Sequence, residues 1–223
     1  MYQNIIITIN EGQIEPVNNG NINISKEEKL NTTIWTFSSN NELLLNNEIT
    51  KFIDDNNRYI ISYNGMSLEK LLVNELVKKN YTISFCESCT GGMLSSTIVN
   101  VSGASNVFEQ SYVTYSNEAK IKLLNVNRQT IKKHSVYSPK VAEEMVIGLY
   151  NKTHANICVS VTGRAGGDEY CDGDGSCDFA IYINDNNGDY LQVEHYQVHG
   201  KRNDVRKMQT NYILWRIYLR MKG

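Results

Sequence analysis

Residues 82–92 read Thr-Ile-Ser-Phe-Cys-Glu-Ser-Cys-Thr-Gly-Gly, and this stretch decides the fold of most of the chain. Its first apolar residues predict the end of a buried strand, its polar residues a tight turn, and Met93 after it the start of a helix. A strand that turns sharply into a helix lifts a side chain such as Ser88 off the carboxyl edge of a sheet and exposes backbone N–H groups there. Gly91 and Gly92 lack a Cβ atom, so a substrate could approach this backbone closely. An ordinary turn with a capping Ser or Thr is the alternative interpretation.

Composition excludes several classes of protein. Of the 223 residues, 41% are hydrophobic and 21% are charged, which allows a sizeable core and disfavours wholesale disorder. A net charge of −2 and a pI of about 6.1 give no electrostatic footprint for nucleic acid or an acidic membrane. No apolar run approaches the roughly 18–20 residues that span a bilayer, and the first residues lack the features of a signal peptide. We expect no nucleic-acid partner and no membrane association.

The cysteines point to a reducing compartment. There are five, an odd number, and Cys86, Cys89 and Cys158 lie in apolar or turn contexts. Free thiols of this kind are typical of a cytoplasmic protein. Cys86 and Cys89 also have the spacing of a redox pair, but Ser88 between them belongs to a stronger pattern.

Residues 1–65 differ from the remainder. Short β-rich runs at 5–9, 21–25 and 32–37 are separated by turns rich in Asn and Gly, and the apolar run 43–53 is compatible with a strand or a helix. No cluster of side chains here suggests chemistry. We expect a small β-rich N-terminal appendage of unknown role.

Residues 66–223 alternate between helix and strand signals. Helices are expected over 68–79 and 93–101, from 118, from Pro139 and after Arg202, and strands over 82–86, 107–108, 112–115, 156–161, 179–183 and 191–198. Ser138 and Pro139 form a clear helix start, with Ser as the cap and Pro in the first turn. The alternation predicts an α/β protein, a three-layer α/β/α sandwich.

Ligands bind such sheets at the carboxyl ends of the strands. Ser88, Tyr115 and Thr162 follow three of the expected strands, and Arg202 precedes the last helix. We expect the strand 156–161 to leave the sheet at Thr162–Gly163. A long loop, dense in Gly and Asp, is then expected over 164–178.

Four segments resemble the C-terminal domain family of the competence/damage-inducible protein CinA, also known as the stand-alone nicotinamide-mononucleotide (NMN) deamidase. They are Glu87–Gly92, Val113–Lys120, Ser160–Gly163 with Ala165–Gly166, and Gly200–Arg202, in the family's order. The resemblance covers about residues 66–222. Residues 1–65 are too few for the large N-terminal nucleotide-processing domain of full-length CinA proteins.

The resemblance implies a hydrolase of NAD metabolism that converts NMN to nicotinate mononucleotide and ammonia without metal or cofactor; we expect a homo-oligomer. By the family's motifs Ser88 is the nucleophile, and Tyr115 and Lys120 support it. A serine hydroxyl needs a neighbour that removes its proton, and a desolvated Lys or a hydrogen-bonded Tyr can do so. Taken singly, Lys120 is also compatible with a solvated helix residue and Tyr115 with a core aromatic.

The resemblance, together with the chemistry of the residues, also suggests which residues contact the substrate. Backbone N–H groups at 89–91 are candidates for the oxyanion hole. Gly91, Gly92, Thr162, Gly163 and Arg202 are candidate substrate-binding residues. Thr162 and Arg202 suit the substrate phosphate, Arg202 through its forked donors.

The segment after Gly163 departs from the family. Where the family usually continues Thr-Gly-Ile-Ala-Gly-Pro-x-Gly-Gly, Arg164 replaces Ile, Gly167 replaces Pro, and an acidic loop follows. We expect Arg164 to face the pocket or its rim and to add positive charge near the phosphate. Two hypotheses follow: a serine amidohydrolase acting on NMN or a related pyridine nucleotide, and a catalytically degenerate relative that binds a nucleotide or a protein.

A metal site in the acidic loop is the remaining alternative. Asp172, Asp174 and Asp178 suggest Ca²⁺, but Cys177 stands where an EF-type register requires Gly. Cys171 and Cys177 alone are too few for structural zinc. We expect no metal, and a mobile, solvated loop.

Overall fold

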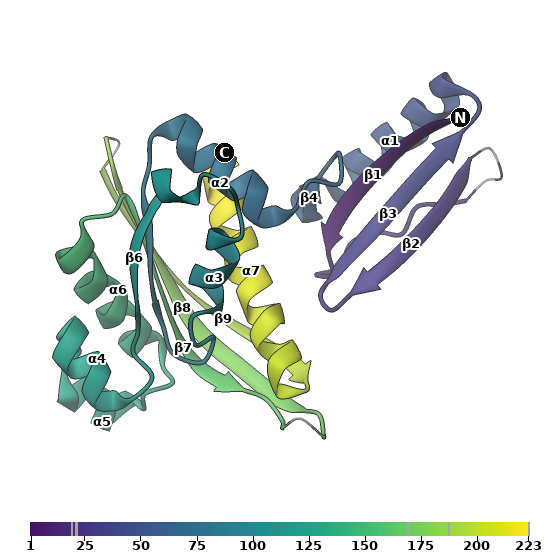
Figure 1. Cartoon of the computed structure of the whole chain (residues 1–223). Helices are drawn as coiled ribbons and strands as arrows, with labels where there is room; N and C mark the ends of the chain where they lie inside the picture. Colours follow the sequence, from purple (N-terminus) through teal and green to yellow (C-terminus); the bar gives the residue numbers. More distant parts are fainter. Residues whose placement is uncertain (19, 21, 169, 187, 223) are drawn as a thin grey trace. The chain divides into compact units, whose positions relative to one another are not determined.

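The computed structural model describes all residues except Asn19, Asn21, Glu169, Asn187 and Gly223. The run 21–25, the Asn- and Gly-rich turn before it, and the connection between the expected strands 179–183 and 191–198 therefore lie partly outside the described residues. The chain divides into two compact units, Met1–Leu71 and Leu72–Gly223 (Figure 1). The division falls inside helix α2 (Leu68–Lys79), whereas the sequence suggests a boundary before residue 66.

The N-terminal unit is an antiparallel sheet with one helix. Its strands are β1 (Tyr2–Ile9), β2 (Asn23–Lys29), β3 (Thr32–Ser39) and β4 (Ile60–Ser62), in the order β2-β3-β1-β4. Helix α1 (Glu42–Asn56) begins at Asn41, whose side chain accepts a hydrogen bond from the Leu44 N–H, and a 3-10 turn over Asn57–Tyr59 follows. The ambiguous run 43–53 is therefore helical. Phe52 of α1 packs against Trp35 and Phe37 of β3.

The C-terminal unit contains a five-stranded mixed sheet. Its strands are β5 (Ile83–Glu87), β6 (Phe108–Val113), β7 (Ile157–Ala165), β8 (Gly173–Asp185) and β9 (Gly188–Gly200), in the order β6-β5-β7-β8-β9. β5 runs parallel to β6 and β7, and β8 and β9 extend the sheet as an antiparallel hairpin.

Helices cover both faces of this sheet (Figure 1). The helices are α3 (Met93–Val99), α4 (Asn117–Leu124), α5 (Arg128–His134), α6 (Pro139–Thr153) and α7 (Arg202–Lys222), with a 3-10 turn over Ala104–Asn106. α6 packs on the sheet with α4 and α5 beside it, and α7 and α3 pack on the opposite face. The unit is therefore a three-layer α/β/α sandwich.

The expectation of a long loop over 164–178 is wrong. β7 does not leave the sheet at Thr162–Gly163 but continues to Ala165 and pairs with β8, so only 166–172 connect the two strands. Gly163 permits this close pairing, because a Cβ atom there would lie 2.1 Å from the Ser176 carbonyl oxygen. Cys177 and Asp178 are buried in the sheet and do not belong to a solvated loop.

Candidate active site

Glu87 holds the turn between β5 and α3. Its fully buried carboxylate accepts hydrogen bonds from the backbone N–H groups of Gly92 (2.9 Å) and Leu94 (3.1 Å). It also accepts from the N–H (2.9 Å) and the hydroxyl (2.6 Å) of Ser95. The first N–H groups of a helix have no partner within the helix. Glu87 therefore caps α3 and fixes the turn that carries Ser88, a role that the sequence analysis missed.

Ser88 and Lys120 meet at the floor of a pocket. The Lys120 Nζ lies 2.9 Å from the Ser88 Oγ and donates to the Thr114 carbonyl at 2.7 Å. Lys120 is fully buried and Ser88 is 4% exposed. Burial disfavours the charged amine, which lowers the pKa of Lys120 from its ordinary value to about 8. With this pKa about a tenth of the amine is neutral at pH 7, and the neutral form is able to accept the Ser88 proton.

The start of α4 brings Lys120 to this position. The Ser116 hydroxyl accepts a hydrogen bond from the Ala119 N–H and caps the helix, so that Lys120 lies in its first turn. Tyr115 precedes the cap, and its carbonyl oxygen lies 3.4 Å from the Lys120 Nζ.

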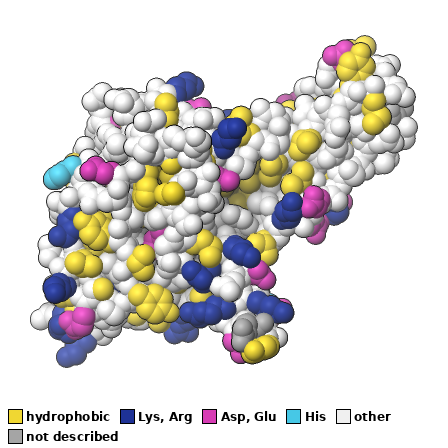
Figure 2. Space-filling view, viewed as in Figure 1, with side chains coloured by type: hydrophobic (Ala, Val, Ile, Leu, Met, Phe, Trp, Pro, Cys, Tyr) yellow, Lys and Arg dark blue, Asp and Glu magenta, His cyan; other side chains and the backbone are white. Residues whose placement is uncertain are grey.

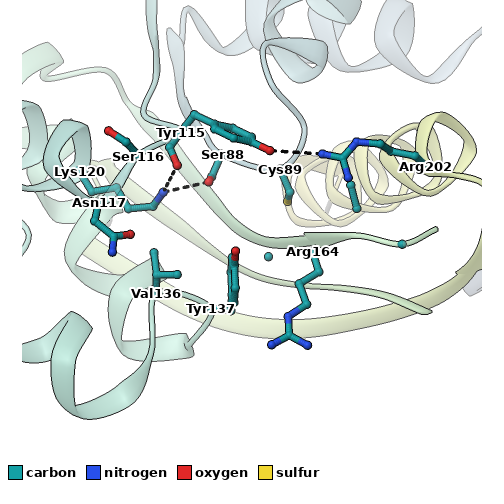
Figure 3. A pocket seen from close by; sticks show the side chains of 13 residues that line it. Ser88, Cys89, Tyr115, Ser116, Asn117, Lys120, Val136, Tyr137, Arg164 and Arg202 are labelled. Carbon is teal, nitrogen blue, oxygen red and sulfur yellow. Dashed lines mark hydrogen bonds between the residues drawn. The ribbon is translucent and has the colours of Figure 1, made fainter. Parts of the chain in front are cut away.

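Four large side chains form the rim of the same pocket, which has a volume of about 350 Å³ (Figure 3). Tyr115 is 63% exposed, and its hydroxyl accepts a hydrogen bond from the Arg202 guanidinium at 3.3 Å. Tyr137 is 44% exposed, and the Arg164 guanidinium lies 5.2 Å from the centre of its ring. Figure 2 shows Lys and Arg side chains gathered over the end of the unit where α7 begins, the end that carries Arg202.

The pocket brings together only part of the predicted substrate-binding set. Gly163 and Arg202 line it, whereas Gly91, Gly92 and Thr162 do not. The Thr162 hydroxyl is buried and donates to the Val136 carbonyl at 2.8 Å, so it holds the segment next to the pocket and is not available to a phosphate. Gly91 and Gly92 have φ angles of +59° and +92°, and they shape the turn.

The three backbone N–H groups that are candidate oxyanion donors differ in the partners they have in the free protein. The Gly91 N–H donates to the Ser88 carbonyl at 3.1 Å. The backbone N–H groups of Cys89 and Thr90 interact with the Cys89 sulfur, and Cys89 lines the pocket. Burial raises the pKa of the Cys89 thiol to about 12, and since the thiolate is the nucleophilic form, Cys89 does not compete with Ser88.

Two of the three acidic residues of the alternative metal site, Asp174 and Asp178, pair with histidines. Asp178 pairs with His195 at 2.9 Å and Asp174 with His199 at 3.0 Å, across β8 and β9. Among the residues that the structure describes, no group of three or more His, Cys, Asp or Glu side chains could hold a metal ion. None of the helices in the described part of the chain has the length and apolar character that a membrane crossing requires.

The chain is similar in sequence to proteins of one family. The model of the CinA C-terminal domain matches residues 65–220. A CinA-like protein of Petrotoga mobilis is 41% identical over 172 residues, which cover 76% of this chain and 41% of that protein. A putative competence-damage inducible protein of Alkaliphilus oremlandii is 42% identical over 157 residues, 70% of this chain and 37% of its own. The chain therefore spans about two fifths of the length of these relatives.

Solved structures of the same family also resemble this chain. The competence damage-inducible protein A from Klebsiella pneumoniae has a TM-score of 0.64 at 25% identity, covering 70% of this chain and 96% of that one. A CinA superfamily protein from Escherichia coli has a TM-score of 0.58 at 27% identity, covering 68% and 88%.

Proposed function

Because the chain belongs to the CinA C-terminal domain family, we propose that it hydrolyses the carboxamide of NMN, or of a related pyridine nucleotide, to the carboxylate and ammonia. One observation carries the proposal: a buried amine, with its pKa lowered to about 8, lies 2.9 Å from a buried serine hydroxyl at the floor of a pocket.

Ser88 and Lys120 carry the proton transfers in both halves of the proposed reaction. Neutral Lys120 accepts the Ser88 proton while the Ser88 Oγ attacks the carboxamide carbon. We assign the resulting oxyanion to the N–H groups of Cys89 and Thr90, which would exchange their interaction with the Cys89 sulfur for it. Lys120 then returns the proton to the leaving ammonia. In the second half, water attacks the acyl ester while Lys120 takes a proton from it and delivers this proton to the Ser88 Oγ, which releases the acid.

Arg202 and Tyr115 complete the proposed site. Arg202 begins α7 at the pocket and offers forked donors that match a phosphate. Its guanidinium donates a hydrogen bond to the Tyr115 hydroxyl, which links these two side chains of the rim.

We further propose that residues 66–223 form the catalytic domain of a cytoplasmic homo-oligomer. All five cysteines are free thiols, which supports a reducing compartment. Light scattering on the full chain tests the assembly.

The test of the activity is ammonia release from NMN by the full chain, with nicotinate mononucleotide identified by chromatography. Nicotinamide riboside and NAD, assayed in parallel, define the substrate. The alternative is a nucleotide-binding relative without turnover. It is favoured by the departure from the family at Arg164, which lies on the rim of the pocket. Binding of NMN without ammonia release would replace the hydrolase proposal by that alternative.

A further inference from the structure

We infer that Tyr137 is the aromatic wall of the substrate site opposite Tyr115, and that Arg164 is the residue that positions it. The inference deepens the proposed function, on which it rests for the identity of the ligand. It assigns a substrate contact to a residue outside all four motifs of the resemblance.

Tyr137 is held in place from both sides by its own segment. The Tyr137 N–H donates to the Ser135 hydroxyl at 3.3 Å, and the Ser138 hydroxyl donates to the Ser135 carbonyl at 2.8 Å. On one side the Val136 carbonyl is tied to Thr162 of β7, and on the other Ser138 caps α6. The backbone that carries Tyr137 is therefore anchored to the sheet and to a long helix.

The side chain of Tyr137 faces the reacting groups. In Figure 3 it lies across the pocket from Tyr115, with its hydroxyl end directed towards the side where Ser88 lies. Both tyrosines line the pocket, and each is substantially exposed. Two exposed aromatic rings on either side of a nucleophile make a slot that suits a planar ring.

Arg164 acts on this ring and not on the Arg202 subsite. Its guanidinium lies over the Tyr137 ring, and in Figure 3 it points away from Arg202. A guanidinium over an aromatic face attracts it and restricts its rotamers. The expectation that Arg164 adds charge at the phosphate is thus replaced by a positioning role.

The chemistry of the slot selects an aromatic carboxamide. Ser88 and Lys120 act on the amide, the two tyrosines contact the ring that bears it, and Arg202 takes the anionic end. Aliphatic amides such as glutamine lack the ring and lose the contact with both walls.

The test is a double-mutant cycle on NMN affinity, measured by calorimetry in a Ser88→Ala background that prevents turnover. Loss of an aromatic contact to a ring weakens binding by about tenfold or more, which we expect for Tyr137→Leu. Tyr137→Phe retains the ring and stays within about threefold of the parent. Arg164→Met weakens binding by about threefold, as expected for a cation–π contact at an exposed site.

The cycle separates positioning from direct contact. If Arg164 acts through Tyr137, Arg164→Met has no further effect in the Tyr137→Leu protein. An Arg164→Met effect of the same size with and without Tyr137 would overturn the positioning role. In enzyme with Ser88 intact, both variants should raise KM and leave kcat within about threefold, because the ring contact exists in ground and transition states alike.

A second Arg–Tyr pair provides the control. The Arg220 guanidinium lies 4.0 Å from the centre of the Tyr190 ring, outside this pocket. Tyr190→Leu and Arg220→Met should leave NMN affinity unchanged.

Two outcomes distinguish this inference from the proposed function. In the first outcome, the wild-type chain binds NMN but releases no ammonia, and Tyr137→Leu loses the binding. This outcome would support the aromatic wall and exclude the hydrolase. Normal hydrolysis with Tyr137→Leu affinity within about twofold of the parent would overturn the wall and leave the hydrolase intact.

Discussion

The floor and the rim of the pocket differ in their exposure to water, and the difference separates two tasks. Ser88 and Lys120 at the floor are buried, whereas Tyr115 and Tyr137 at the rim are 63% and 44% exposed. Removal of water from the floor lowers the pKa of the Lys120 amine, which is the base beside Ser88 in the proposed mechanism. Exposed rim side chains can be exchanged at small cost to the fold. We infer that the floor determines the reaction and the rim determines the substrate.

The largest expected effect comes from the floor. Ser88→Ala removes one hydroxyl and should lower kcat for ammonia release by at least about 10³-fold, because no acyl ester can form. Ser96→Ala, on the exposed side of α3, is the matched control and should keep normal turnover. Residual activity above about a tenth of wild type would remove Ser88 from the mechanism.

Lys120→Met should lower kcat by about 10²- to 10⁴-fold, the usual contribution of a general base. Methionine keeps the length of the buried stem and removes the amine. The exposed Lys122 on the same helix provides the control Lys122→Met, whose rate should be normal. A normal rate in Lys120→Met would show that another group accepts the Ser88 proton.

The pH dependence of kcat/KM sharpens the assignment. Lys120 acts as a base only when neutral, and its pKa in the folded protein is about 8. The rate should therefore rise about tenfold per pH unit below pH 8 and level off above it. If kcat/KM, measured from about pH 6 to about pH 9, does not change with pH, Lys120 is not a base with this pKa.

A smaller effect is expected at the rim. Arg202→Ala should raise KM for NMN by about tenfold with little change in kcat, because a phosphate contact is made equally in the ground and transition states. Lys207→Ala, on the exposed side of α7, should leave KM unchanged. An unchanged NMN affinity in Arg202→Ala would refute the phosphate assignment.

The smallest effect is expected from removal of residues 1–65, most of the N-terminal unit. A fragment of residues 66–223 keeps α2 whole together with the five-stranded sheet. It should fold alone and release ammonia at a rate within about twofold of the full chain, since a domain with its own core is stable by itself. An insoluble or partly folded fragment would show that residues 1–65 complete the core.

Local sequence patterns predicted most elements of the C-terminal unit. Apolar spacing placed α2 correctly, and the Ser138 cap placed the start of α6, because one buried face and a capping hydroxyl are local signals of a helix. The short helix α5 was missed, since none of its residues is buried and it carries no apolar periodicity. The stretch 164–178 was taken for a loop because its Gly and Asp residues are typical of turns; pairing with neighbouring strands overrides that local preference.

The sequence by itself determined the three-layer fold through the alternation of helix and strand signals along the chain. It also determined the strand-to-helix turn that presents Ser88 and the motif that contains Lys120, because each of these depends on residues close together in the chain. Only the tertiary structure decided what surrounds them. It buries Lys120 against Ser88 across a separation of 32 residues, engages Thr162 with Val136, and places Arg164 over Tyr137. The pKa of an amine depends on the water removed from it by neighbours distant in the chain. Local sequence alone does not specify those neighbours.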